Sequence, residues 1–215
     1  TMLMSIFNRA WAGYHCNILW GKIFCFLLFV KVKVEGHENI DKRTSYVFVA
    51  NHQGVFDIFS LMGFLGHPFC WMMRKALTNI PFVGTACMLT GQILVDTHSA
   101  QGIKKTMEDA KKILNKGLSV CVFPEGRRTD TGKMGAFKKG AFKLALDFNL
   151  PVVPITISGS YDVMPRSTFN VTPGTIHITI HKPIPPAANG HDLKELAESS
   201  YQAIQSALAP KYKDA

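Results

Sequence analysis

Short apolar runs alternate with longer amphipathic stretches along most of this 215-residue chain. Apolar runs of roughly four to eight residues bounded by turn residues favour buried strands, whereas apolar residues spaced three and four apart favour helices. The pattern predicts strands at 46–50, 91–95, 118–123, 152–157 and 175–181, and helices at 57–65, 101–115, 138–148 and 192–208.

This alternation of strands with helices favours an α/β fold, with a mainly parallel or mixed central sheet flanked by helices. In the run 175–181, isoleucines alternate with polar residues, so we expect that strand to be half exposed. No internal repeat, low-complexity tract or linker divides the sequence, which favours one main domain.

The N-terminal region contains a strongly apolar stretch at residues 18–34. Lys22 interrupts this stretch, and its longest uninterrupted apolar run is Ile23–Val30. That run is far shorter than the roughly 20 apolar residues that a membrane-spanning helix needs.

Two interpretations of this stretch remain: a buried helix leading into a strand, or a helix lying in a membrane interface. Trp11, Trp20 and the neighbouring lysines are residues that gather at such interfaces, and they favour the second interpretation. We therefore expect an N-terminal membrane-associated helical segment at 1–34 and the main domain at 35–215.

The chain carries 24 Lys and Arg against 15 Asp and Glu, a net charge of +9, which favours an anionic partner. The candidates are a nucleic acid, an acidic membrane surface or a phosphorylated small molecule. A nucleic-acid partner has no recognisable reading motif to support it. Lys133, Lys138, Lys139 and Lys143 are typical of a solvated face, although some of them could contact lipid headgroups.

Polar residues gather where three of the predicted strands end, at 51–52, 96–97 and 124–128. In open α/β sheets, ligands bind at the carboxyl ends of the strands. The sequence therefore predicts the functional site at this edge of the sheet. No Gly-x-Ser-x-Gly elbow, P-loop, dinucleotide fingerprint or zinc-ligand spacing offers another chemistry.

His52 and Asp57 form the first candidate constellation. On one continuous helix, residues five apart would point about 140° away from each other. We therefore expect His52 in the loop after the strand and Asp57 at the start of the helix, with Gly54 permitting the bend. A carboxylate bonded to one ring nitrogen fixes the tautomer and leaves the other nitrogen to accept a proton. The alternative is a helix-capping aspartate beside an unrelated histidine.

The second constellation is Phe123–Thr129, where Pro124-Glu125-Gly126 ends a strand sharply and Arg127 and Arg128 follow. A guanidinium presents a planar fork that suits phosphate oxygens. The alternative is a solvated basic turn in which Glu125 makes a local ion pair.

In their order and spacing, these segments resemble the blocks of the glycerolipid acyltransferase family, and within it the bacterial 1-acylglycerol-3-phosphate acyltransferases. Asn51–Asp57 resembles that family's His-x4-Asp block, and Gly91–Asp96 resembles its second block. Phe123–Thr129 is similar to the third block, usually Phe-Pro-Glu-Gly-Thr-Arg-Ser, and Val153–Ile155 to the Val-Pro-Ile strand. The resemblance spans roughly Val34–Ile184.

The resemblance implies that a thioester donor, acyl-coenzyme A or acyl carrier protein, acylates the sn-2 hydroxyl of lysophosphatidic acid to give phosphatidic acid. His52 would be the general base and Asp57 would orient it, without metal or bound cofactor. It also implies a membrane phospholipid surface as partner and the cytoplasmic face of the cell membrane as location. The residues assigned to substrate binding are Asp96, Thr97, Glu125, Gly126, Arg127, Arg128 and Thr129.

Two departures from the family pattern concern the acceptor. Thr97 stands where an arginine is usual, and Arg127 stands where a small Thr or Ser is usual. The hypothesis that Arg127 partly replaces the missing guanidinium predicts that Arg127→Thr weakens acceptor binding sharply. Two alternatives stay open: a different acceptor, such as a lyso-aminolipid, or a membrane-binding module without catalysis.

Overall fold

A single mixed sheet forms the centre of the computed structural model, which describes residues 9–80, 84–85, 90–96, 99–186 and 192–213. In these residues the strand order is β1-β7-β6-β2-β5-β3-β4. Only β6 and β7 pair antiparallel, whereas every other neighbouring pair is parallel. The predicted α/β class is therefore confirmed. The strands are β1 (Val30–Glu35), β2 (Val47–Ala50), β3 (Phe69–Arg74), β4 (Ile93–Val95), β5 (Ser119–Val122), β6 (Val152–Ser158) and β7 (Gly174–Ile180).

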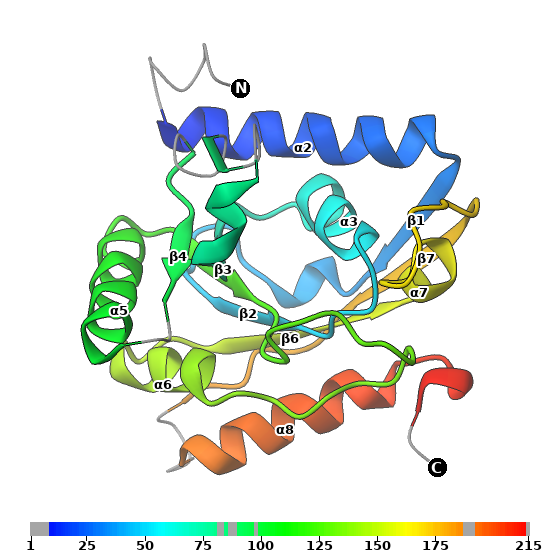
Figure 1. The fold of residues 1–215 in the computed structure, drawn as a ribbon. Coiled ribbons are helices and arrows are strands. Elements are labelled where there is room, and N and C mark those ends of the chain that lie inside the picture. Colours follow the sequence, from blue (N-terminus) through cyan, green and yellow to red (C-terminus); the bar gives the residue numbers. More distant parts are fainter. Residues whose placement is uncertain (1–8, 81–83, 86–89, 97–98, 187–191, 214–215) are drawn as a thin grey trace.

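Helices cover both faces of the sheet, with α2 and α3 on one face and α5, α6 and α8 on the other (Figure 1). The α-helices are α2 (Arg9–Leu27), α3 (Phe56–Phe64), α5 (Ala100–Leu114), α6 (Gly140–Asp147), α7 (Ser160–Val163) and α8 (Leu193–Ser206). Short 3-10 turns add η1 (His37–Asn39), η2 (Lys75–Asn79) and η3 (Pro210–Tyr212).

Strand β2 shows how the two faces are built, because successive side chains on a strand point to opposite sides. Phe48 and Ala50 pack into the core shared with α2 and α3. Val47 and Val49 pack into the core shared with α5, α6 and α8. All four side chains are fully buried, so β2 is rigidly held on both faces up to the residue before the predicted site.

Helices α2 and α3 cross at two glycines. A Cβ on Gly21 would lie 2.5 Å from the carbonyl oxygen of Phe59 and 2.6 Å from the amide nitrogen of Gly63. The rings of Phe24 and Phe59 stack beside this crossing, 4.6 Å apart. The glycines thus let the two backbones touch. None of the described helices combines the length and apolarity needed to cross a bilayer.

The N-terminal stretch is a helix that leads into a strand, but its outer side is exposed and not buried as the first of the two sequence interpretations predicts. After α2 ends at Leu27, β1 pairs along its whole length with β7 as an edge strand. The boundary expected between residues 34 and 35 therefore falls inside β1. Strand β3, with the sequence FCWMMR, was not predicted, because cysteine, tryptophan and methionine give neither β-branched enrichment nor alternation.

Five strands end at one edge of the sheet, because β2, β3, β4, β5 and β6 run in the same direction. The segments predicted to carry chemistry follow β2, β4 and β5. The fold thus delivers all three to the same edge, and the strand order decides which of them meet.

Candidate active site

His52 and Asp57 meet in the loop between β2 and α3. The Nδ1 atom of His52 lies 2.8 Å from Oδ2 of Asp57. The same oxygen accepts hydrogen bonds from the backbone N–H groups of Gln53, at 2.7 Å, and Gly54, at 2.8 Å. The Asp57 side chain is fully buried, and the His52 side chain is 13% exposed. Three groups thus converge on one oxygen of Asp57, and the pair has the predicted orientation.

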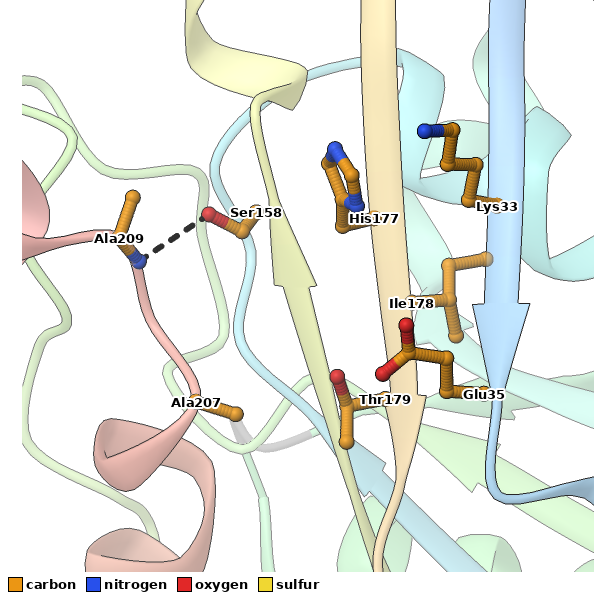
Figure 2. A pocket seen from close by; sticks show the side chains of 8 residues that line it. All are labelled: Lys33, Glu35, Ser158, His177, Ile178, Thr179, Ala207 and Ala209. Carbon is orange, nitrogen blue, oxygen red and sulfur yellow. Dashed lines mark hydrogen bonds between the residues drawn. The ribbon is translucent and has the colours of Figure 1, made fainter.

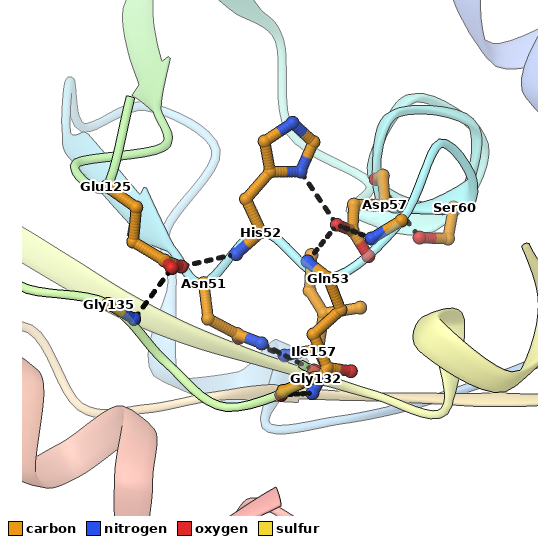
Figure 3. Close-up of polar contacts among 10 residues, drawn as sticks. Asn51, His52, Gln53, Asp57, Ser60, Glu125, Gly132, Gly135 and Ile157 are labelled. Carbon is orange, nitrogen blue, oxygen red and sulfur yellow. Dashed lines mark hydrogen bonds and ion pairs between the residues drawn. The ribbon is translucent and has the colours of Figure 1, made fainter. Parts of the chain in front are cut away.

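The imidazole ring of His52 is fixed in direction as well as in tautomer. A proton on Nδ1 donates to Asp57, which leaves Nε2 as the nitrogen with a free lone pair. Figure 3 shows that this second nitrogen points away from Asp57. The ring stacks on Phe123 at 3.9 Å with an interplanar angle of 7°, and Phe123 stacks in turn on Trp71. Nε2 can therefore act as a general base toward a substrate.

The loop after β5 holds the main chain of His52 on both sides. Its N–H donates to Oε1 of Glu125 at 2.7 Å, and its carbonyl accepts from the N–H of Thr129 at 2.9 Å. The other oxygen of Glu125 accepts from the N–H of Gly135 at 2.8 Å. Both carboxylate oxygens of Glu125 are thus engaged with backbone groups (Figure 3), so this side chain positions the histidine.

Glu125 is the site carboxyl with a strongly shifted pKa. Burial raises the pKa of Glu125 to about 7, and the nearby charge of Asp57 adds to the shift. The hydrogen bonds from Gly135 and His52 oppose it. A carboxyl whose pKa is raised to about 7 therefore lies directly behind the pair of His52 and Asp57.

The two arginines of this loop differ in their surroundings. Arg127 is 67% exposed, and its Nη1 lies 3.4 Å from Oδ2 of Asp130. Arg128 is half-buried, and it meets no acidic partner among the described residues. Gly126 has a φ of 76°, and its N–H donates to the carbonyl of Phe123. Of the two arginines, Arg128 is thus the one whose side chain is left to bind an anion.

Asp96 is separated from the pair of His52 and Asp57. It follows β4, which lies three strand positions from β2, or roughly 14 Å at the usual strand spacing. Its carboxylate makes an ion pair with Lys75 at 3.0 Å. Thr97 lies outside the described residues. The structure therefore brings together the ends of β2 and β5 but does not bring Asp96 to them.

Two polar residues of the block Asn51–Asp57, to which the sequence pattern assigned no role, support the pair. The Asn51 side chain donates to the carbonyl of Ile157 at 2.8 Å and accepts from its N–H at 2.7 Å. The amide of Gln53 donates to the carbonyl of Gly132 at 2.9 Å. Their position directly after a buried strand could have indicated this role, because buried polar side chains there need hydrogen-bond partners on the backbone.

A hollow of about 410 Å³ lies elsewhere, between β1, β7 and the segment after α8 (Figure 2). Lys33, Glu35, His177 and Thr179 are among its lining residues, and neither His52 nor Asp57 is. In the part of the chain that the structure describes, no group of three His, Cys, Asp or Glu side chains is placed to hold a metal ion.

The family model described as Acyltransferase matches residues 31–158, more than half of the chain. The chain belongs to the acyltransferase family. The matched segment begins in β1, ends with β6, and contains His52, Asp57 and the loop after β5. The resemblance drawn from the sequence blocks is therefore confirmed.

Relatives of this acyltransferase support the assignment. A 1-acyl-sn-glycerol-3-phosphate acyltransferase of Chlamydomonas reinhardtii is 36% identical over 207 residues, which are 94% of this chain and 60% of the relative. One of Pseudomonas aeruginosa is 32% identical, over 81% of this chain and 66% of the relative. The crystal structure of a 1-acyl-sn-glycerophosphate (LPA) acyltransferase from Thermotoga maritima matches with a TM-score of 0.76 and 30% identity, over 87% of this chain and 75% of that chain. The chain thus spans less than two thirds of the length of these curated relatives.

Proposed function

We propose that this acyltransferase moves a fatty acyl group from a thioester donor to the sn-2 hydroxyl of 1-acylglycerol-3-phosphate, giving phosphatidic acid. The observation that carries the proposal is the pair of His52 and buried Asp57, joined at 2.8 Å, with Nε2 turned away from Asp57. The names of the relatives support the acceptor. The assembled geometry also argues against a module that has lost catalysis.

The reaction is a direct transfer. Nε2 of His52 takes the proton of the acceptor hydroxyl while its oxygen forms a bond to the thioester carbonyl carbon. Asp57 stabilises the resulting imidazolium. The carbon–sulfur bond then breaks, and the leaving thiolate takes the proton from the imidazolium. Among the described residues, the N–H groups of Arg127 and Arg128 meet no acceptor, which leaves them available to the oxyanion.

The donor and the acceptor headgroup belong to the same proposal. The departing thiol is that of coenzyme A or of an acyl carrier protein. Arg128 binds the phosphate of the acceptor, because it is half-buried and unpaired on the loop that holds His52. A phosphate near the guanidinium would place the glycerol hydroxyl toward the imidazole.

The deciding experiment compares wild type with His52→Ala for acyl transfer from oleoyl-coenzyme A to lysophosphatidic acid. Wild type should form phosphatidic acid, and His52→Ala should lose at least about 100-fold in kcat, the lower range of a general base's contribution. His37→Ala, which changes an exposed histidine on η1, serves as the matched control. Equal rates for wild type and His52→Ala would refute the mechanism.

We also propose that the protein works at the cytoplasmic face of the cell membrane, with α2 lying in the interface. Its outer side exposes a stripe of large apolar residues, which continues into the turn before β1. A helix with such a stripe and flanking lysines lies in the headgroup region. The exposed residues are Leu19, Trp20, Ile23, Phe26, Leu27 and Phe29.

Vesicle sedimentation tests this location. The double substitution Phe26→Ser with Leu27→Ser removes two side chains that are 80% and 62% exposed. Burial of one such side chain contributes about 1.5 to 3 kcal/mol, so binding to vesicles should weaken by at least tenfold. Ile103→Ser, at an exposed apolar position on α5, is the control and should bind like wild type. Unchanged binding of the double variant would contradict the placement of α2.

A further inference from the structure

Lys138 is folded back onto the loop that holds His52. Its backbone N–H donates to the carbonyl of Pro124 at 2.9 Å. Its side chain then lies across Gly126, so that a Cβ on that glycine would be 2.7 Å from Nζ and 3.1 Å from Cε. The ammonium of a residue twelve positions away therefore lies beside the turn between Glu125 and Arg128.

The ammonium of Lys138 also carries a charge that no described carboxylate neutralises. Among the residues that the structure describes, no carboxylate pairs with it, although its side chain is exposed. Other lysines do pair with aspartates, which neutralises much of their charge. These are Lys75, Lys105, Lys112, Lys143 and Lys211.

Of the two arginines that could bind a phosphate, the geometry leaves only Arg128 available. Arg127 is turned to Asp130 at 3.4 Å, whereas Arg128 is unpaired in the described part of the chain. Arg128 directly precedes Thr129, whose backbone N–H donates to the carbonyl of His52. Arg128 and Lys138 thus lie on the same connection between β5 and α6, and both contact the part of it that holds the main chain of His52.

A phosphate monoester carries close to two negative charges at neutral pH, so one guanidinium leaves it incompletely compensated. We propose that Lys138 is the second cation of the acceptor site and holds the phosphate together with Arg128. Lys138 takes the role that the sequence hypothesis gave to Arg127. This inference rests on the proposed function, because it concerns the phosphate of that acceptor.

The test is a kinetic comparison with two acceptors, lysophosphatidic acid and a monoacylglycerol that lacks the phosphate. Lys138→Met keeps most of the side-chain length and removes the charge. It should raise KM for lysophosphatidic acid roughly tenfold, leave kcat within twofold, and leave the rate with monoacylglycerol unchanged. Lys138→Arg should restore KM to within about threefold of wild type.

Lys139→Met is the matched control, since Lys139 is also exposed and lies next in the chain. It should leave KM for lysophosphatidic acid within twofold of wild type. An unchanged KM in Lys138→Met, an equal rise in Lys139→Met, or a sharp rise confined to Arg127→Thr would each overturn the inference. A wild type without His52-dependent acylation of lysophosphatidic acid would instead overturn the proposed function.

Discussion

The side chain of Asn51 links the end of β2 to β6 by hydrogen bonds immediately before His52. Replacing it with alanine should remove this link. The last paired residues of the two strands are Ala50 and Ile155. Beyond them the side-chain amide of Asn51 bonds both the N–H and the carbonyl of Ile157, at 2.7 and 2.8 Å. The amide therefore continues the ladder where the backbone of β2 has already turned toward the active site.

The expected cost follows from these two contacts. Ile157 is fully buried, so Asn51→Ala leaves a backbone donor and a backbone acceptor without their partners in the core. Each such group costs about 1 to 3 kcal/mol, and local relaxation recovers a part, which gives about 2 to 4 kcal/mol in total. In a domain of this size, that loss lowers Tm by roughly 4–16 °C. Because the displaced residue adjoins His52, kcat should also fall at least tenfold.

Thermal unfolding and steady-state kinetics with lysophosphatidic acid measure the two effects on the same preparations. Asn115→Ala is the matched control, because Asn115 is the exposed C-cap of α5 and should change stability by less than about 0.5 kcal/mol. The reasoning is refuted if Asn51→Ala unfolds within 2 °C of wild type. A normal kcat in a clearly destabilised variant would show that β2 is held there for stability alone.

Three further substitutions test the site and its supports. Asp57→Asn should lower kcat by at least about 100-fold, because a neutral amide no longer stabilises the imidazolium. The surface change Asp147→Asn is the control and should leave kcat unchanged. An Asp57→Asn variant that keeps more than a tenth of the wild-type kcat would contradict this role. The pKa of Glu125 is raised from 4.5 to about 7, so folding favours its neutral form. The stability that Glu125 contributes is complete below pH 4.5 and is lost as the pH rises through 7, by about 3 kcal/mol at most. Glu125→Gln removes this titration, so the Tm of the variant minus that of wild type should rise between about pH 5 and about pH 8. A Tm difference that stays constant over this range would argue against the raised pKa of Glu125. Gly21→Val brings side-chain atoms against the backbone of α3 and should lower the free energy of unfolding by about 1 to 3 kcal/mol. Gly140→Ala is the control and should not change it, because the space around its Cβ position is open. Equal Tm values for the two variants would contradict the close crossing of α2 and α3.

The sequence was sufficient for most of the sheet, because its strands are short apolar runs ended by turn residues. The predicted strand at 152–157 corresponds to β6 at Val152–Ser158, and the predicted helix at 101–115 corresponds to α5 at Ala100–Leu114. Strand β3 was missed because its side chains pack without alternation or β-branching. Helix α2, Arg9–Leu27, lies within the helical segment predicted at 1–34, although the apolar stretch that supported that prediction begins only at residue 18.

For the site, the sequence predicted the meeting of His52 with Asp57, since a loop followed by a helix start is the arrangement that lets side chains five apart touch. It did not predict which strand ends would be neighbours. Strand order arises from packing across the whole sheet, and it places β5 beside β2 but β4 three positions away. For that reason Asp96, although it follows a strand at the correct edge, pairs with Lys75 at a distance from the catalytic histidine.

The position of Glu125 illustrates a more general limit. Its neighbours in sequence are arginines, which favours an ion pair or a ligand role, yet its oxygens accept from the N–H groups of His52 and Gly135. Nearly every residue carries a backbone N–H, so no residue type in the sequence marks these partners. The loop after β5 therefore contacts His52 in three ways: Phe123 stacks on its ring, Glu125 accepts from its N–H, and Thr129 donates to its carbonyl. A change in that loop which touches no substrate should therefore still lower kcat, because the base and its support form one structural unit.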